Sequence, residues 1–144
     1  MGKRRILKKK GSGIDSGKRD RALSKTAKRR VDRAILYIES TFNNTRVSLA
    51  DASGGTLMWT SSGALGFSGN RKSTPFAAAK AGEVIGEKAA AIGVKEVDVY
   101  IKGVGAGRES ALRAFASKGA TVLSIHDVTP VPHNGPRRPK PRRV

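Results

Sequence analysis

The stretch 63–76 combines glycines, cations and a helix start in an order suited to binding an anion. Glycine stands at positions 63, 66 and 69, where the backbone can bend without the steric limits of a side chain. Arg71 and Lys72 follow, and Thr74 and Pro75 then suit the N-cap and the first position of a helix. Free backbone donors and the positive end of a helix favour an anion there, and the two cations strengthen that preference. The competing interpretation is a strand-to-helix turn with solvated cations.

A second glycine-rich stretch, 103–107, is followed by Arg108. It lies between a predicted strand and a predicted helix, where dinucleotide-binding folds carry G-x-G-x-x-G. The spacing does not fit, because the third glycine comes one position early, and no second strand–helix–strand half follows. Two interpretations stay open: a phosphate-binding turn that uses backbone donors and Arg108, or a turn that needs glycine conformations.

Positive charge is concentrated at the two ends of the chain. The 144 residues include 29 lysines and arginines and 11 acids, which gives a formal net charge of +18. Residues 1–33 carry 14 basic and 3 acidic residues, residues 133–144 carry 5 basic and no acidic residues, and the span 34–132 is almost neutral. We therefore expect a basic N-terminal arm (1–33), an α/β body (34–132) and a basic Pro/Arg-rich tail (133–144). Such arms suit a polyanionic partner.

Hydrophobic periodicity predicts an α/β body. Strands are expected at 34–42, 45–50 and 56–61, joined by short turns into an antiparallel meander. A helix is expected from Pro75 to about Ile92, a strand at 96–102, a second helix at 108–118 and a last strand at 121–128. The order βββ-α-β-α-β implies a mixed sheet of about five strands with two packed helices. In the N-terminal arm, Ala22, Leu23, Ala27 and Val31 could form a short amphipathic turn or two on a partner.

Enzymatic chemistry finds little support in the sequence. The acids Asp51, Asp98 and Asp127 fall on or beside strands, but nothing makes them converge on a Mg²⁺ site, and surface or ion-paired roles are favoured. His126 and His133 are a poor metal pair, and there is no cysteine, so we expect no cofactor, no metal and no disulfide. No apolar run approaches a membrane span, and a cytoplasmic protein is the default expectation. Among the aromatic residues, Phe67 is predicted at a loop tip, where it could stack on a base or form a lid over the core. The other aromatic residues are mostly expected in the core.

Four motifs occur in a fixed order along the chain. They are Phe42-Asn43-Asn44-Thr45, the run from Arg71 through Ala78 (RKSTPFAA), Gly107-Arg108-Glu109-Ser110, and Asp127 through Gly135 with its DVTP and PHNG segments. Together they resemble the bacterial type of the universal small-subunit ribosomal protein eleven family, over about residues 30–144. Val104 and Ala106 stand where that family usually has proline, Ser68 where a basic residue is common, and Pro136 where cysteine is commoner.

The resemblance implies an RNase-H-like α/β sheet without catalytic carboxylates. It also implies a place on the platform of the small ribosomal subunit, bound to ribosomal RNA close to the exit of the messenger RNA path. Its expected neighbours are ribosomal proteins six, seven, eighteen and twenty-one, with initiation factor three nearby. Carried over by position, the implied RNA contacts are Asn43, Asn44, Gly69, Arg71, Lys72, Ser73, Arg108, His133, Asn134, Gly135, Arg137 and Arg138.

From the residues and the resemblance together, we expect a structural, non-enzymatic RNA-binding protein of the small ribosomal subunit. To the contacts above, the loops and the tail add Gly66, Phe67, Asn70, Gly103, Gly105, Gly107, Lys140, Arg142 and Arg143. Two rival hypotheses come from other classes of protein. A nucleoid or chaperone-like binder would use the arms alone, and a nuclease would need Mg²⁺ and Asp98.

Overall fold

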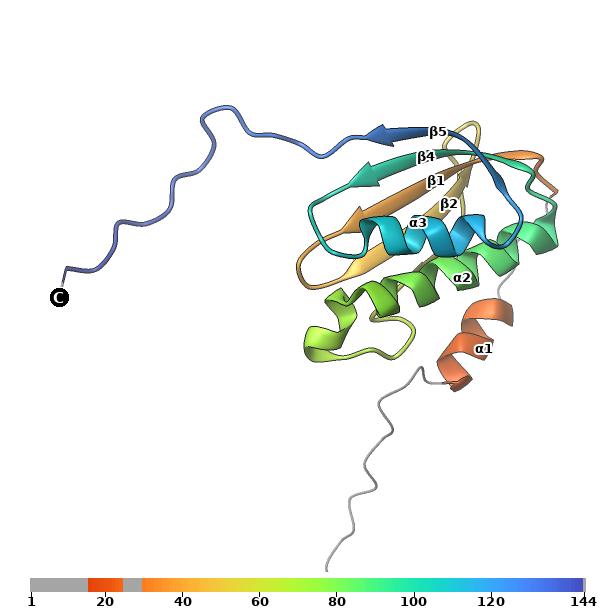
Figure 1. Cartoon of the computed structure of the whole chain (residues 1–144), viewed down its shortest axis with the longest axis horizontal. Helices are drawn as coiled ribbons and strands as arrows, with labels where there is room; N and C mark the ends of the chain where they lie inside the picture. The colour runs from red at the N-terminus through yellow and green to blue at the C-terminus, as the bar shows by residue number, and fades with distance from the viewer. Residues whose placement is uncertain (1–15, 25–29, 144) are drawn as a thin grey trace, which may run out of the picture.

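The computed structural model describes residues 16–24 and 30–143 as a layered α/β protein (Figure 1). Every strand and both long helices predicted from the periodicity are present, with bounds that differ by a few residues at most. The elements are α1 (Ser16–Ser24), β1 (Arg33–Ser40), β2 (Thr45–Asp51), β3 (Thr56–Ser61), the 3-10 helix η1 (Gly69–Ser73), α2 (Pro75–Ile92), β4 (Glu96–Lys102), α3 (Arg108–Ala116) and β5 (Thr121–Asp127).

The five strands form one mixed sheet in the order β3-β2-β1-β4-β5. β1, β2 and β3 are antiparallel neighbours, while β4 runs parallel to both β1 and β5. Both parallel connections pass through a helix, as such crossovers require. The predicted mixed sheet is therefore confirmed, with β3 and β5 as its edge strands.

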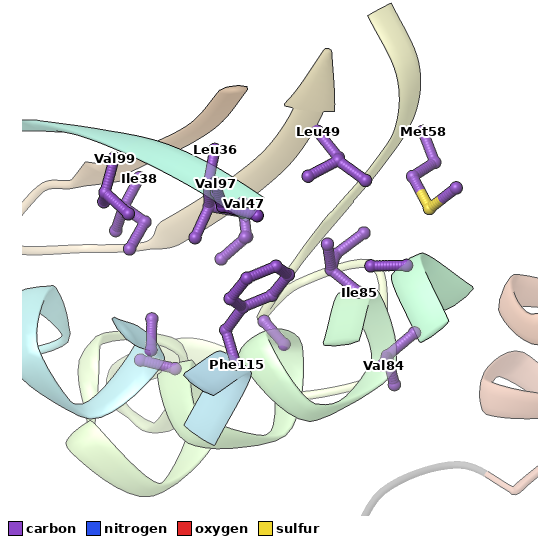
Figure 2. Close-up of a cluster of buried hydrophobic side chains, with 14 of the residues drawn as sticks. Leu36, Ile38, Val47, Leu49, Met58, Val84, Ile85, Val97, Val99 and Phe115 are labelled. Carbon is purple, nitrogen blue, oxygen red and sulfur yellow. The ribbon is translucent and has the colours of Figure 1, made fainter. Parts of the chain in front are cut away.

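The helices α2 and α3 lie side by side on one face of the sheet and enclose the core (Figures 1 and 2). The predicted alternation holds, since Val47 and Leu49 in β2 and Val97 and Val99 in β4 are fully buried. Phe115 of α3 is also fully buried and projects toward these strands in Figure 2. The predicted apolar stripe of α2 is buried throughout: Ala77, Ala81, Val84, Ile85, Ala89 and Ile92. Gly93 ends α2 in the left-handed conformation (φ 86°), as expected for a helix stop.

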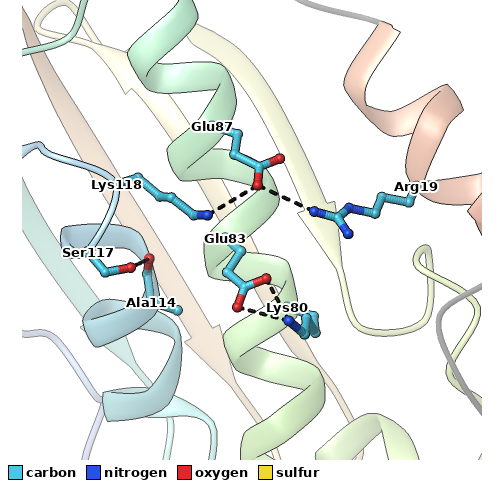
Figure 3. A network of polar contacts seen from close by, with 7 residues as sticks. All are labelled: Arg19, Lys80, Glu83, Glu87, Ala114, Ser117 and Lys118. Atoms are coloured by element: carbon cyan, nitrogen blue, oxygen red, sulfur yellow. Dashed lines mark hydrogen bonds and ion pairs between the residues drawn. The ribbon is translucent and has the colours of Figure 1, made fainter.

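A helix not assigned from the sequence, α1, packs beside α2 in the segment expected to be an arm. Arg19 donates to Glu87 of α2 at 3.3 Å, and Lys118 donates to the same carboxylate at 3.2 Å (Figure 3). One acid therefore links α1, α2 and the end of α3. Val31 packs partly buried against the core. Ala27 and the side chains of Ala22 and Leu23 lie outside the described residues.

Several aromatic residues are exposed where the sequence predicted core positions. Phe42, Trp59 and Phe76 are 76%, 55% and 59% exposed, and Tyr37 also reaches the surface. In the strands the cause is the alternation itself: Tyr37 and Trp59 fall on the sheet face opposite α2 and α3. Tyr37, Tyr100 and His126 occupy one cross-strand row and stack on one another, with ring centroids 5.5 and 4.9 Å apart.

Beyond β5, residues 128–143 form neither helix nor strand and run away from the sheet (Figure 1). Every residue of this segment is exposed except the half-buried Thr129. The five prolines in it account for the lack of a helix, because each removes a backbone donor and fixes φ. Within the described part of the chain, no helix has the length and apolar character to cross a membrane.

Candidate nucleic-acid interface

The first glycine-rich loop leads into η1 and then into α2, and α2 starts at the predicted residues. Thr74 caps α2, since its hydroxyl accepts from the Ala77 amide at 3.3 Å and donates to the Arg71 carbonyl at 2.7 Å. Pro75 occupies the first turn. η1 was not predicted; its first turn closes with the Arg71 amide donating to Ser68 at 3.3 Å. It turns Gly69, Asn70 and Arg71 outward into solvent.

The structure changes the expected chemistry of this loop. The amides of Ala77 and Ala78 both donate to Thr74, so the cap already occupies donors at the positive end of α2. Farther back, the amides of Gly66 and Phe67 bond to Gly63 and Ser62. The backbone therefore offers fewer free donors than the sequence implied. An anion at this site would be bound mainly by side chains.

Arg71 and Lys72 are the cations available for that role. Arg71 is exposed and Lys72 is half-buried, with the Lys72 stem lying over Gly63. Neither takes part in any ion pair found among the described residues, and the stretch 63–76 contains no acid. The hydroxyl of Ser73 donates to the Asn70 carbonyl at 3.0 Å, which ties the two ends of η1 together. The result is a short projection whose charges form no ion pair with another described residue.

Phe67 does not occupy the exposed loop tip that the sequence predicted. It is 8% exposed and belongs to the core, which is the alternative of a lid over the core. Its ring meets Phe76 edge to face, with centroids 6.1 Å apart. Phe76 is the exposed aromatic residue beside Arg71 and Lys72, and the Lys80 ammonium lies 5.7 Å from its ring centroid. The helical periodicity could have identified Phe76, since position 76 lies off the buried stripe of α2.

Asn43 and Asn44 form the turn between β1 and β2, next to the first loop. Thr41, a residue the sequence analysis did not single out, organises this turn: its hydroxyl accepts from the amides of Asn43 and Asn44 at 3.3 and 3.1 Å. The Asn44 side chain accepts from the Gly63 amide at 3.3 Å and so fixes the turn to the loop. Asn43 is exposed. The structure therefore brings Asn43 to the same region as the first loop and gives Asn44 a structural bond.

The second glycine-rich loop is packed against the end of β1. A Cβ on Gly103 would lie 2.1 Å from the Ser40 carbonyl oxygen, and one on Gly105 would lie 2.3 Å from that of Thr41. A Cβ on Gly107 would lie 2.3 Å from the Thr45 hydroxyl oxygen. Gly103 also has φ of 101°, and the Gly105 amide donates to Ser40 at 2.9 Å. Of the two interpretations, these contacts favour the turn that requires glycine.

Arg108 is engaged within the protein. Its guanidinium donates to the Gly103 carbonyl at 2.6 Å and to the Asp127 carboxylate. Asp127 also accepts from the Thr129 hydroxyl at 2.6 Å and from the Thr129 amide at 3.0 Å. These bonds, chiefly those from Thr129 and then that from Arg108, hold the pKa of the Asp127 carboxyl well below its usual value. Arg108 therefore fastens the second loop to the end of β5.

Each of the acids considered for metal-dependent chemistry bonds to its own set of partners. Asp98 bonds to Ser124 and Arg33 at 2.7 and 2.8 Å, and these partners lower the pKa of its carboxyl. Asp51 accepts from the amides of Ser53 and Gly55 in the β2–β3 turn. No group of three or more potential metal-ligating side chains occurs in the described parts of the chain.

The C-terminal tail is the second cationic region of the structure. Its predicted contact residues are all exposed, and Asn134 adopts a positive φ of 54° beside Gly135. None of its cations joins an ion pair found in the described residues. The tail residues concerned are His133, Asn134, Gly135, Arg137, Arg138, Lys140, Arg142 and Arg143.

An almost neutral α/β body with a cationic loop and a basic extension is typical of the class of proteins that bind nucleic acids. The family model described as ribosomal protein S11 matches residues 34–143. The chain therefore belongs to the ribosomal protein S11 family, which confirms the resemblance. Members of this family are small-subunit ribosomal proteins that bind ribosomal RNA, and their role is structural rather than enzymatic.

Proposed function

We propose that the chain binds small-subunit ribosomal RNA through two cationic regions, the first loop with η1 and the C-terminal tail. The observation that carries this proposal is that Arg71 and Lys72 form no ion pair with another described residue and that the stretch 63–76 around them contains no acid. Gly69, Asn70 and Ser73 flank these cations in η1, and Asn43 lies in the turn that Asn44 ties to the start of the loop. Phe76 offers an exposed ring for stacking on an unpaired base.

In this proposal the second loop supports the interface without binding RNA through its glycines. Gly105 and Gly107 are buried, and the known bonds of Arg108 go to Gly103 and Asp127. The tail leaves the body directly after this network. Arg108 therefore helps fix the point from which the basic tail starts, while the tail cations Arg137, Arg138, Lys140, Arg142 and Arg143 contact phosphates.

The wider setting is also part of the proposal and is supported by the family membership. The protein would lie on the platform of the small subunit, close to the messenger RNA exit path, in the cytoplasm. Its neighbours would be ribosomal proteins six, seven, eighteen and twenty-one, with initiation factor three nearby. It would support subunit assembly and translation.

The test is the double variant Arg71→Ala/Lys72→Ala of the full-length protein, titrated with small-subunit ribosomal RNA at several salt concentrations. Losing two phosphate contacts should weaken binding by about tenfold or more and reduce the slope of log K against log salt by about 2. The unfolding free energy should change by less than about 1 kcal/mol, because Arg71 is exposed and Lys72 loses only the packing of its half-buried stem over Gly63.

A matched control removes the same charge elsewhere. Lys95→Ala/Arg113→Ala also takes away two largely exposed cations, one after α2 and one on α3, each already near an acid. This control should change RNA affinity far less than the loop variant. Equal losses in both variants would mean that net charge alone drives binding, and would overturn the assignment of the first loop. Sedimentation with the small subunit in moderately high salt provides the same comparison in a cell lysate.

A further inference from the structure

The edge strand β5 differs from the regions proposed to bind RNA. Leu123, Ile125 and Val128 are 48%, 57% and 47% exposed, so three large apolar side chains follow one another along or just beyond this strand. β5 pairs only with β4 within the described residues, and α3 makes its sheet contacts mainly with β1. In Figure 1 the tail leaves the end of β5 and runs away from the strand. An apolar strand edge therefore stays uncovered in the described part of the chain.

The free side of β5 also carries backbone groups that pair with no other strand among the described residues. The amide of Val128 donates to Ile101 of β4 at 2.9 Å. Because backbone directions alternate along a strand, the amides of Ile125 and Asp127 point away from β4. The β4–β5 register shifts between Val97 and Asp98, so this alternation applies to the strand from Ser124 onward. These amides and carbonyls form a row to which another strand can bond.

The lack of lysine and arginine distinguishes this edge from an RNA-binding surface. Between Lys118 and Arg137 the chain has no lysine and no arginine, although 29 of the 144 residues are basic. The one acid of β5, Asp127, is already bonded to Arg108 and Thr129. Edge strands are commonly protected by lysine, by proline or by a covering element. β5 contains neither lysine nor proline, so its exposed edge fits a protein contact rather than a phosphate backbone.

We propose that the edge of β5 is a docking site for an extended segment of a neighbouring protein in the assembled small subunit. The segment would add as a sixth strand beside β5 through main-chain hydrogen bonds, and its alternate apolar side chains would cover Leu123 and Ile125. This inference rests on the family membership and not on the choice of RNA contacts, because it needs the protein in the small subunit but not Arg71 or Lys72.

The test uses the absence of cysteine from the sequence. Thr121→Cys places a single thiol on an exposed residue at the start of β5 and leaves Leu123 and Ile125 unchanged. The thiol of the full-length protein is labelled with a benzophenone maleimide, the protein is incorporated into small subunits, and the particles are irradiated. Val131→Cys, labelled in the same way, is the control, since it is 74% exposed but lies in the tail.

The expected result is a cross-link from Thr121→Cys to a peptide of one neighbouring protein. Adding Leu123→Lys/Ile125→Lys should reduce that cross-link by about tenfold or more, because charged side chains on an edge oppose strand addition. Both positions are exposed, so the protein should still fold and sediment with the small subunit. The inference is overturned by cross-linking to ribosomal RNA, to a second copy of this chain or to no protein, or by a protein cross-link that the lysines leave unchanged. RNA affinity, the readout of the first-loop proposal, is measured separately, so either proposal can fail alone.

Discussion

The loop before α2 and the loop before α3 both join a strand to a helix, and both are rich in glycine. In the first loop, a Cβ on Gly69 would meet nothing within 4 Å, and Arg71 and Lys72 lie beside it without acidic partners among the described residues. In the second loop, a Cβ on Gly103 would clash with the backbone of Ser40. Arg108 donates hydrogen bonds to Gly103 and to Asp127. Glycine content alone therefore does not identify a phosphate site. The partners of the neighbouring cations separate the two loops.

The largest expected effect is that of Gly103→Ala in the second loop. The new methyl group would clash with the Ser40 carbonyl, and φ of 101° disfavours any side chain. Overpacking and left-handed strain together should lower the unfolding free energy by about 3 kcal/mol. Urea unfolding of the free protein measures this loss. A change below about 0.5 kcal/mol would mean that the loop relaxes freely and that its close packing is not required.

A smaller effect is expected for Arg108, and two substitutions separate structure from RNA binding. Arg108→Ala loses bonds to Gly103 and Asp127 and should cost about 1–2 kcal/mol, since the pair is partly exposed. Arg108→Lys keeps the charge but loses the planar fork that reaches both partners. If the role is structural, lysine restores little stability and RNA affinity changes little for the folded protein. An affinity lost with alanine and recovered with lysine, at unchanged stability, would assign Arg108 to phosphate binding instead.

These loops also show how far the sequence predicts this structure. The alternation in β4, the cap at Thr74 and the stop at Gly93 follow from residues close together in the chain, and all three were predicted correctly. The packing of Gly103 against Ser40 joins residues far apart in the sequence, so no local pattern contains it. The capped donors of α2 were missed for a related reason. Residue types identify Thr74 as a cap, but which amides it occupies follows from the bonds that its hydroxyl and carbonyl accept in the structure.

The candidate site was predicted in part. Residue types place Arg71 and Lys72 just before a helix; in the structure they lie in η1 ahead of α2, with Arg71 exposed and Lys72 half-buried. The sequence predicts Phe67 at a loop tip, either stacking on a base or covering the core, and Phe76 in the core; in the structure Phe67 is buried over the core and Phe76 is exposed. A loop with glycines on both sides of Phe67 gives no periodicity from which to decide its direction. Only the fold, which turns the loop back over the core, settles the direction of that ring.

A third prediction concerns the first loop, where Gly69 has open space around it. Gly69→Ala in the first loop meets no neighbour, but φ of 57° is unfavourable for alanine. The cost should therefore be no more than about 1 kcal/mol, well below that of Gly103→Ala. Urea unfolding of both variants under the same conditions gives the comparison directly. A loss as large as that of Gly103→Ala would show that the first loop is as tightly constrained as the second.

The smallest expected effect is the part of the acid dependence that comes from Asp127, the acid bonded to Arg108 of the second loop. The pKa of Asp127 is lowered in the folded protein from an ordinary value of 3.8, mainly by Thr129 and then by Arg108. Between about pH 5 and pH 3 the unfolded chain therefore binds a proton before the folded one, and the stability from these bonds is lost as the pH falls. Asp127→Asn should lose less stability than the parent protein over this range, as measured by urea midpoints at both pH values. Asp98, also with a lowered pKa, contributes equally to both proteins and cancels in the comparison.

The first loop provides the control for that measurement, because the stretch 63–76 contains no acid. Arg71→Ala/Lys72→Ala should therefore leave the pH dependence of the urea midpoint close to that of the parent protein. A parallel flattening in both variants would place the titrating interaction outside the Arg108–Asp127–Thr129 network. A flattening confined to Asp127→Asn would link the acid sensitivity of the fold to the bonds that fasten the second loop and the start of the tail.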